Sequence, residues 1–560
     1  MSNASLELGG DNWAAKDGNL LGYAVGDSSG KYVPREFTFT RGSNLAATRV
    51  AANGLIEKGR ENLFLQSNQF DTSWPKNKLN LTSGQSGYDG SSDAWKITSN
   101  DTGSSYVRQI ITSSGVQTAS VYAAKGNVDY IYFRIAGSQN QGAFINLSNG
   151  TIDSYLNQGN IIDISVNNVS GDWYRISITF NTTTSDIRFY ASDSGGSNSE
   201  TGSYIYIQDA QLEQGLVATN YIETGATTVQ AGLLEDEPRI DYTGGTGSLL
   251  LEPSRTNLVE YSEYFEGSGW NIQPNTTTAE LTQETLSPEG LYNAYKFAGD
   301  GSSGFYKASA GIYGGENTKS IYLKAAVNGT QVVLKDPNQT VTTKTLTLTT
   351  DWVRYELTET QTSSFGIWID DIPSDPIYAW GAQVEEGSYA TSYIPNHSGG
   401  SVTRNTDVTL SLTNAGADGL INNYNTTIFI NLKKIISVNN VIRFVTLFPN
   451  GGANNPRVLL YGNMSNALVQ YRVTGQADQS ITSPYNRDEV NKIAIRISGT
   501  SLTMFHNGEE VNTITIVQGD DLEYLSLAES AATDSGYLLN QLLSFPTALS
   551  DAECITLTTL

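Results

Sequence analysis

The sequence contains one cysteine, Cys554, and two histidines in 560 residues. A single cysteine excludes an intramolecular disulfide, so packing or assembly must hold the fold together. His397 lies in a predicted linker and His506 in a predicted hairpin, and neither context is typical of a general base or a metal ligand. We therefore expect no catalytic residue, no metal site and no cofactor, and predict that the chain is not an enzyme.

Positive charge is also scarce. The chain has 33 Lys and Arg against 57 Asp and Glu, a formal net charge of −24, and no segment gathers basic residues into a patch that could neutralise phosphates. No apolar run approaches the roughly 20 residues of a membrane helix. The first residues lack the basic and apolar regions of an export signal. We expect a soluble chain with no nucleic-acid partner and no membrane insertion.

The sequence instead offers short segments in which apolar and polar residues alternate. Examples are YIYFRIAG at 130–137 and WYRISITF at 173–180, each flanked by Asp, Ser or Asn. A period of two is typical of half-buried antiparallel strands, and many short strands indicate β-sandwiches. The predicted fold class is all-β: a string of antiparallel jelly-roll β-sandwiches after a short N-terminal segment.

One long segment is written twice. RENLFLQSNQFDTSW at 60–74 returns as RTNLVEYSEYFEGSGW at 255–270, and AQLEQGLVATNYIETG at 210–225 returns as AQVEEGSYATSYIPN at 382–396. Anchors that recur in the same order indicate a duplicated domain. The predicted organisation is an N-terminal attachment segment, a first sandwich, a linker, a second sandwich and a C-terminal sandwich, at residues 1–59, 60–228, 229–252, 253–400 and 405–560.

The last segment is not a third copy. It contains a predicted hairpin with a tight turn at Asn507-Gly508, where both residues tolerate positive φ. Its end is predicted to be an apolar strand followed by a short helix capped by Ser550. The segment resembles the sandwiches of concanavalin-like, laminin-G-type domains.

Three motifs carry a resemblance to a known class of protein. They are FTRGSNLAATRVAANGLIE at Phe39–Glu57, PRIDYTGGTGSLLLEPSRTNL at Pro238–Leu258, and AQVEEGSYATSYIP at Ala382–Pro395. In this order they resemble bacteriophage virion proteins that carry carbohydrate-binding-module-like sandwiches. The chain departs from that layout because its first sandwich lies between the first two motifs, which looks like a duplication.

The resemblance implies a structural component of a phage virion, in a head, neck or tail fibre or appendage, that binds glycans of the host surface or the environment. The N-terminal segment would contact other virion proteins of the capsid, neck or tail, and the chain would form a homo-oligomer, expected to be a trimer. It would be assembled in the host cytoplasm and released in the virion by lysis. The alternatives are a virion decoration without ligand binding and, less favoured, a polysaccharide depolymerase.

Aromatic residues are the candidates for glycan contacts, because sugar rings stack on flat side chains. Trp368 and Trp380 occur only in the second copy, and Tyr130 and Tyr132 only in the first. These four residues are the predicted ligand-binding set. The alternative is that they are core positions at which the two copies carry different residues. Tryptophans at matched positions of the two copies are expected in the core. They are Trp74 with Trp270, Trp173 with Trp352, and Trp95, which aligns with Tyr295.

Two acidic clusters leave other chemistry open. Asp370, Asp371 and Asp375 follow one another closely, as do the residues at 235–237. A solvated loop or a calcium site made of loop oxygens is the favoured interpretation. A catalytic carboxylate pair is the alternative, because sequence separation does not fix the distance between two carboxylates.

Overall fold

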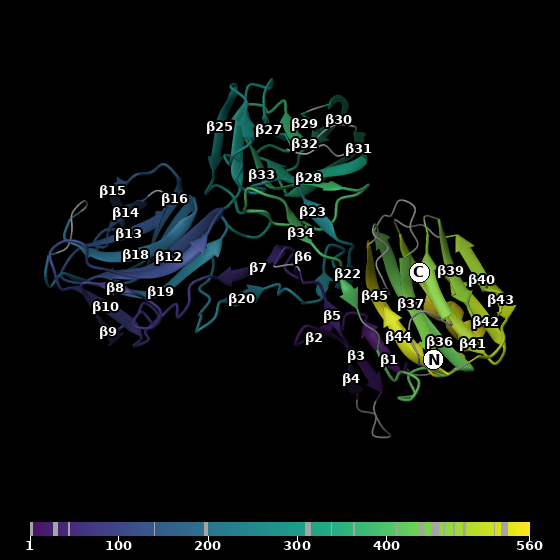
Figure 1. Cartoon of the computed structure of the whole chain (residues 1–560). Helices are drawn as coiled ribbons and strands as arrows, with labels where there is room; N and C mark the ends of the chain where they lie inside the picture. The colour runs from purple at the N-terminus through teal and green to yellow at the C-terminus, as the bar shows by residue number, and fades with distance from the viewer. Residues whose placement is uncertain are drawn as a thin grey trace.

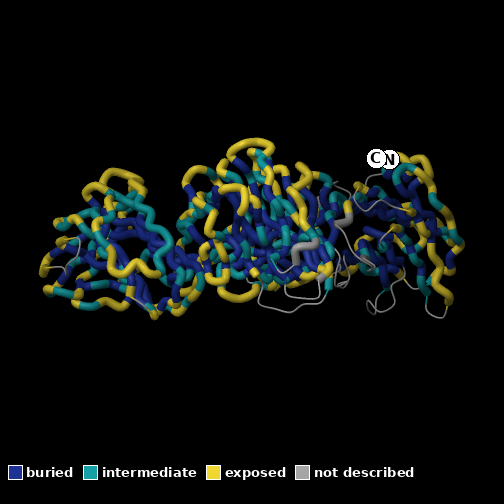
Figure 2. The backbone as a smooth tube through the Cα atoms, turned by 90° about the horizontal axis from the view of Figure 1, so that it is seen from above, coloured by how far each residue is buried: buried dark blue, intermediate teal, exposed yellow. Residues whose placement is uncertain are grey.

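The computed structural model describes residues 4–25, 32–42, 45–138, 140–194, 200–308, 315–337, 339–361, 365–409, 412–435, 442–449, 458–463, 465–473, 476–484, 489–519, 521–527 and 536–560. Within these ranges the chain is antiparallel β-structure with one helix, arranged as three sandwiches (Figure 1). Three large hydrophobic clusters correspond to them, and buried residues fill the interior of each body in Figure 2. The all-β fold class is confirmed.

The first sandwich consists of two six-stranded sheets, in the orders β15-β14-β13-β18-β11-β8 and β16-β17-β12-β19-β10-β9. Alternate residues of the strands point inward, as Ile131, Phe133 and Ile135 do, and are fully buried. The strands are β8 (Lys76–Asn77), β9 (Leu79–Gln85), β10 (Ala94–Ser99), β11 (Tyr106–Ser113), β12 (Val116–Lys125), β13 (Tyr130–Gly137), β14 (Gln141–Asn146), β15 (Thr151–Leu156), β16 (Ile161–Ser170), β17 (Trp173–Asn181), β18 (Thr184–Ser192) and β19 (Tyr204–Gln214).

The second sandwich repeats this topology with two five-stranded sheets, β24-β27-β32-β29-β30 and β25-β26-β33-β28-β31. These orders match β8-β11-β18-β13-β14 and β9-β10-β19-β12-β17, so β15 and β16 are additions in the first copy. The shared strand order supports the predicted duplication. The strands are β24 (Trp270–Ile272), β25 (Thr276–Leu281), β26 (Tyr295–Gly299), β27 (Phe305–Ala308), β28 (Gly315–Ala325), β29 (Gln331–Asp336), β30 (Gln339–Thr347), β31 (Val353–Gln361), β32 (Gly366–Asp370) and β33 (Ile377–Glu386).

The C-terminal sandwich opposes an 11-stranded sheet to the five-stranded sheet β40-β39-β38-β37-β44. The large sheet follows the path β2-β3-β1-β45-β36-β41-β42-β43, joined by β4, β21 and β22. Its strands and those facing it are β1 (Leu6–Gly9), β2 (Ala14–Lys16), β3 (Asn19–Val25), β4 (Tyr32–Phe37), β21 (Arg239–Asp241), β22 (Ser248–Leu251), β36 (Asn425–Ile435), β37 (Ile442–Pro449), β38 (Val458–Gly462), β39 (Asn466–Tyr471), β40 (Gln479–Pro484), β41 (Val490–Ser498), β42 (Ser501–His506), β43 (Glu509–Thr515), β44 (Leu522–Leu527) and β45 (Gly536–Phe545).

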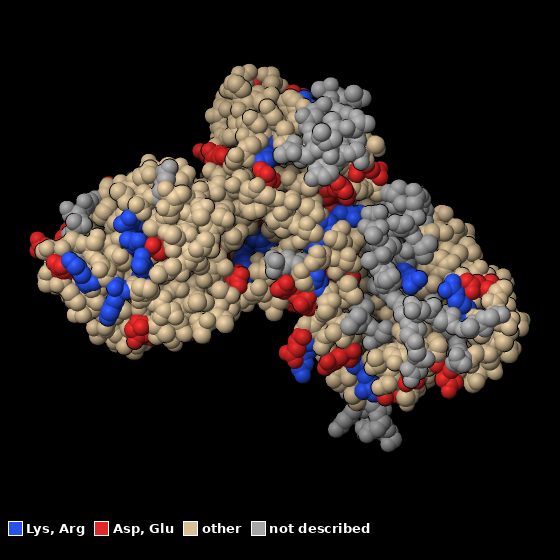
Figure 3. Space-filling model, viewed as in Figure 1, with Lys and Arg blue, Asp and Glu red and all other residues tan. Residues whose placement is uncertain are grey.

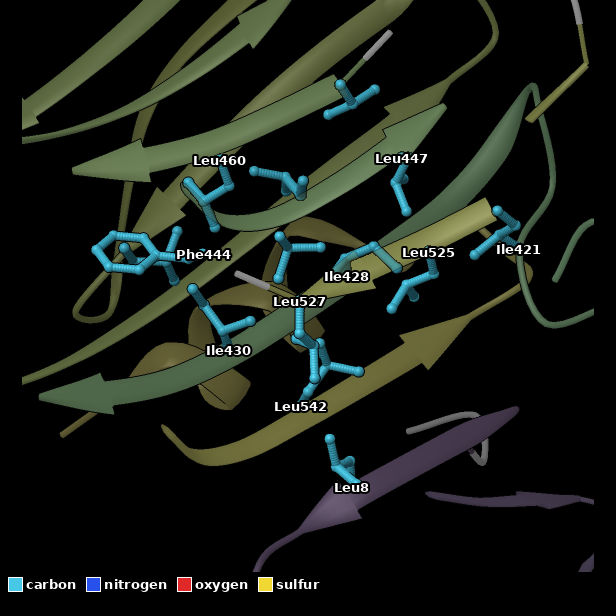
Figure 4. Packing of buried hydrophobic residues seen from close by; sticks show 14 of the residues in the cluster. Leu8, Ile421, Ile428, Ile430, Phe444, Leu447, Leu460, Leu525, Leu527 and Leu542 are labelled. Atoms are coloured by element: carbon cyan, nitrogen blue, oxygen red, sulfur yellow. The ribbon is translucent and has the colours of Figure 1, made fainter. Parts of the chain in front are cut away.

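The N-terminal strands differ from the predicted division of the chain. The sequence predicts a separate segment at residues 1–59, whereas β1 pairs with β45 and its Leu8 lies opposite Leu542. Figure 4 shows these two side chains beside each other in the C-terminal core, where Leu8 is 1% exposed. β1 also pairs with β3, and pairing with β45 brings the apolar residues of β1 into the C-terminal core.

Local features of the C-terminal sandwich agree with the sequence. The turn residues Asn507 and Gly508 have φ of 49° and 88°. Helix α1 (Asp551–Thr558) begins at Ser550, which forms a reciprocal capping box with Glu553. Cys554 lies on this helix and is fully buried, as expected of a small apolar residue. The predicted turn and helix cap are therefore confirmed.

The three sandwiches meet at a junction built from short strands. β7 (Ile56–Asn62) lies between β20 (Val229–Gly232) and β6 (Thr48–Val50), while β5 (Phe39–Thr40) pairs with β35 (Val408–Thr409) and β23 (Arg255–Asn257) with β34 (Val402–Arg404). All of these pairs except β6 with β7 join segments far apart in sequence. The junction therefore fixes how the sandwiches are connected.

Five buried ionic residues tie this junction together, and we call them the junction network. Arg239 and Arg404 donate to the same Glu252 oxygen at 2.8 and 2.6 Å. Arg239 also contacts Asp407, and Arg41 donates to Asp407 at 3.1 Å. All five side chains are at most 3% exposed. Three of these residues belong to the motifs at Phe39–Glu57 and Pro238–Leu258, so those motifs encode the joint between the sandwiches.

We expect Glu252→Gln to destabilise the chain at neutral pH by about 3–5 kcal/mol, because it removes the negative charge that the buried guanidinium groups of Arg239 and Arg404 share. Burial alone would raise the pKa of Glu252, but Arg404 and Arg239 outweigh burial and lower the pKa to about 2. The carboxylate therefore stabilises the folded chain above its ordinary pKa, and this contribution is lost as pH falls from about 4.5 toward about 2.

Urea denaturation followed by tryptophan fluorescence checks this, with exposed Glu509→Gln as the control. The gap between the two variants should be widest near neutral pH and should close between about pH 4.5 and pH 2. A gap that is the same at every pH would contradict the ionic role of Glu252.

Candidate functional site

Strand β13 presents two of the predicted residues on the outer face of its sheet. Because side chains alternate, Ile131 and Phe133 enter the core while Tyr130, Tyr132 and Arg134 face outward. Tyr130 stands at the rim, where its hydroxyl donates to Asp153 Oδ2 at 2.6 Å and accepts from Asn146 Nδ2 at 3.2 Å. The strand thus places both predicted tyrosines on one surface.

Four rings form a continuous band across this face, and we call Tyr106, Tyr132, Phe144 and Tyr190 the aromatic row. Tyr132 lies opposite Phe144 on one side and Tyr190 on the other. Its ring centroid is 4.2 Å from Phe144, with the planes 8° apart, and 4.9 Å from Tyr190. Tyr190 lies 5.1 Å from Tyr106. Burial raises the pKa of Tyr132 to about 12, so its half-buried phenol stays neutral at physiological pH.

A second line of residues crosses the same face beside the rings, and we call Arg108, Arg134 and Arg188 the arginine row. Arg188 lies opposite Arg134 on β13 and opposite Arg108 on β11. The Arg188 guanidinium carbon is 4.7 Å from the Tyr106 ring centroid, a cation–π contact. In Figure 3 basic side chains gather on the first sandwich, in the region where Figure 1 labels β13 and β18.

The equivalent sheet of the second sandwich carries Trp368 on β32. Trp368 is half-buried and lies opposite Tyr306 on β27 and Lys335 on β29. Its ring centroid is 5.4 Å from that of Tyr306 and 3.7 Å from Lys335 Nζ. By strand order and register Trp368 corresponds to Arg188 and Tyr306 to Arg108. The structure therefore places Tyr132 and Trp368 on equivalent faces of the two sandwiches.

Trp380 does not share this position. It points out of the other sheet of the second sandwich, where it packs against Ile56 and Tyr393, and it is fully buried. Lys58 Nζ lies 5.9 Å from its ring centroid. The expectation of a ligand contact is corrected here, because β7, more than three hundred residues earlier in the chain, covers the indole. Sequence comparison of the two copies could not show this cover.

The tryptophans expected in the core divide into two groups. Trp74, Trp95 and Trp270 are buried, at 4%, 7% and 9% exposure. Trp173 and Trp352 are half-buried, and Trp352 donates its indole N–H to the Leu286 carbonyl at 2.8 Å. These two side chains lie on outer sheet faces, at the beginnings of their strands. Their recurrence therefore reflects packing outside the core.

A cavity of about 310 Å³ lies at the junction, lined by Lys58, Glu213, Glu289 and His397 among others. Lys58 Nζ contacts Glu263 at 3.0 Å and Glu289 at 2.9 Å. Burial lowers the pKa of His397 to about 3, with the charge of Lys58 acting in the same direction. His397 is therefore a neutral buried imidazole at physiological pH. Lys58 thus ties β7 to the second sandwich, while Glu213 accepts hydrogen bonds from Gln211 and Thr219.

The acidic clusters are largely engaged in contacts within the protein. Asp370 pairs with Lys335, Asp236 accepts the Arg41 backbone N–H at 2.7 Å, and Glu237 accepts from Arg49 at 3.2 Å. Within the described ranges no group of three or more His, Cys, Asp or Glu side chains could hold a metal ion. Across those same ranges no helix is long and apolar enough to span a membrane.

The comparisons with known proteins come from structure alone, since no family model and no curated protein matches the sequence. The carbohydrate-binding module CBM40 of the Ruminococcus gnavus IT-sialidase, bound to α2,6-sialyllactose, aligns with 24% of this chain and 83% of its own length, at 19% identity and a TM-score of 0.21. The botulinum neurotoxin DC binding domain in complex with SialylT aligns at 12% identity and a TM-score of 0.23. This second alignment covers 26% of this chain and 38% of the toxin domain, so the chain spans well under two thirds of it. With such low sequence identities and TM-scores, these similarities do not establish a ligand for this chain.

The two tryptophans of the second sandwich should respond differently to truncation. We expect Trp380→Ala to lower the free energy of unfolding by about 3–5 kcal/mol, because it empties a fully buried site. Trp368→Ala should cost about 1 kcal/mol or less, because its ring is half-exposed on a sheet face. Urea denaturation of both variants checks the assignment, and equal losses would show that Trp368 is a core residue too.

Proposed function

We propose that the chain is a virion appendage protein that holds a polysaccharide on the outer faces of its two duplicated sandwiches. The observation that carries the proposal is the aromatic row, a band of rings on a rigid sheet with hydrogen-bonding groups beside it. Sugar rings stack on such rings through their C–H faces, and neighbouring polar groups bond the hydroxyls. The Tyr306–Trp368 pair on the equivalent sheet supplies a second surface of the same kind.

The duplication favours binding by many weak sites. Two surfaces on one chain, multiplied by a homo-oligomer and by copies on a particle, raise avidity without any single tight site. A trimer is the proposed state, and light scattering on the purified chain tests it. The virion role is supported by the three motifs in their order, and we propose that the N-terminal segment contacts the neighbouring virion proteins.

Attachment must be compatible with the position of that segment. Strands β1 to β4 are part of the C-terminal sandwich, so contacts through residues 4–25 and 32–42 would present the C-terminal body to the particle. This arrangement leaves the first two sandwiches available to the surroundings. It also fits an adhesive role better than a purely structural decoration, because it leaves accessible the outer faces that carry Tyr132 and Trp368.

Binding to immobilised polysaccharides of host surfaces tests the proposal. We expect Tyr132→Ala and Trp368→Ala each to weaken binding about tenfold, through lost stacking area, and the double variant to abolish the avidity of the chain. Tyr424→Ala, an equally simple truncation of a tyrosine that is 40% exposed on the C-terminal sandwich, is the matched control.

Two other results would replace the proposal. Shortening of the polysaccharide during incubation would favour a depolymerase. No binding to any host-surface polymer by the unchanged chain would leave a structural decoration of the particle.

A further inference from the structure

The arginine row is an unfavourable arrangement for a surface with no partner. Arg134, Arg188 and Arg108 occupy directly opposed positions on three adjacent strands. Like charges placed opposite each other across strands destabilise a sheet. In a chain with a formal charge of −24, acidic residues to neutralise such a row are plentiful, yet the row is only partly neutralised.

Asp186 is the carboxylate that contacts the row. It accepts from Arg188 Nη2 at 3.0 Å and from Arg108 Nη1 at 3.3 Å. Three guanidinium groups and one carboxylate leave a formal charge of +2 on this part of the face (3 − 1). Asp186 therefore neutralises part of the charge of Arg188 and Arg108 and does not contact Arg134.

Arg134 lies outside this compensation. Among the described residues no carboxylate lies within 4.0 Å of it, its Nη1 donates only to the Tyr190 hydroxyl at 3.4 Å, and its buried Nε has no partner. The position beside it on β14 is Gly142, where a Cβ would lie 2.2 Å from the Phe133 carbonyl oxygen. No side chain can therefore stand over the guanidinium from that strand.

The second sandwich shows that the fold does not need these arginines. By strand order and register Arg108 corresponds to Tyr306, Arg188 to Trp368, and Arg134 to Lys335, which pairs with Asp370. The equivalent sheet forms with one cation in place of three, and that cation is paired with a carboxylate. The arginine row is thus a property of the first copy alone.

We infer that the arginine row makes the outer face of the first sandwich selective for an acidic polysaccharide, one whose sugars carry carboxylate or sulfate groups. The inference rests on the proposed function and specifies its ligand class for one of the two surfaces. A guanidinium binds a carboxylate or sulfate through two parallel N–H bonds. The adjacent aromatic row holds the sugar rings, while Arg134 and its neighbours receive the anionic groups. The equivalent face of the second sandwich, where Lys335 is already paired with Asp370, takes uncharged sugars.

Matched polymers that differ only in charge test the inference on the full chain. Polygalacturonate is compared with its methyl ester, and dextran sulfate with dextran, so that the carboxylate and sulfate arms are separate. We expect at least one acidic polymer to bind about tenfold or more tightly than its uncharged counterpart. Raising the salt concentration should weaken this binding and leave binding of the uncharged polymers unchanged.

Arg134→Gln should lower the affinity for the acidic polymer about tenfold and leave the affinity for uncharged polymers unchanged. Arg134→Lys, which keeps the charge but not the two-bond geometry, should recover part of it. Lys96→Gln is the matched control, because Lys96 stands over Tyr204 at 3.6 Å on the other sheet of the same sandwich. Thermal melting of each variant confirms that it is folded.

Each outcome decides between the two claims. Equal binding of charged and uncharged polymers, or equal losses for Arg134→Gln and Lys96→Gln, would overturn the acidic-ligand inference and leave the proposed function standing. Failure of the unchanged chain to bind any polymer would overturn the proposed function and this inference together.

Discussion

The junction network is the interaction on which the arrangement of this chain depends. Arg239, Glu252, Arg404, Asp407 and Arg41 come from segments before, between and after the two duplicated sandwiches, and all are removed from water. Buried ion pairs of this kind contribute little net stability over apolar packing, but removing one partner is costly because the remaining charge is stranded. They therefore specify one way of joining the segments and exclude others.

The network also explains why the most distinctive motifs of the sequence say little about ligands. FTR, PRID and LLLEP each contribute an ionic residue to it. A protein that keeps these motifs keeps the joint, whatever its sandwiches bind. The motifs therefore encode the joint, and the candidate ligand contacts lie instead on the outer sheet faces.

Those faces have diverged on a conserved scaffold. Inside both copies the same polar contacts recur: Glu213 accepts the Thr219 hydroxyl and Glu385 the Thr391 hydroxyl, both at 2.7 Å. Tyr122 and Tyr322 both lie under an arginine, at 5.3 and 5.5 Å. Outside, one copy carries rings with an arginine row and the other a tryptophan with a lysine. Duplication has preserved what holds each sandwich together and altered what each one presents.

The sequence by itself determined the all-β class, the duplication, the capped C-terminal helix and the Asn507-Gly508 turn, because alternation, repetition and turn chemistry act over a few neighbouring residues. It also placed Tyr130 and Tyr132 on one face of their strand, and the same alternation extends to Arg134. Only the tertiary structure decided that Arg188 and Arg108 complete the row, that β7 covers Trp380, and that β1 joins the C-terminal sheet. Each of these depends on which distant strands become neighbours, and burial competes for that pairing over the whole chain, beyond any local pattern.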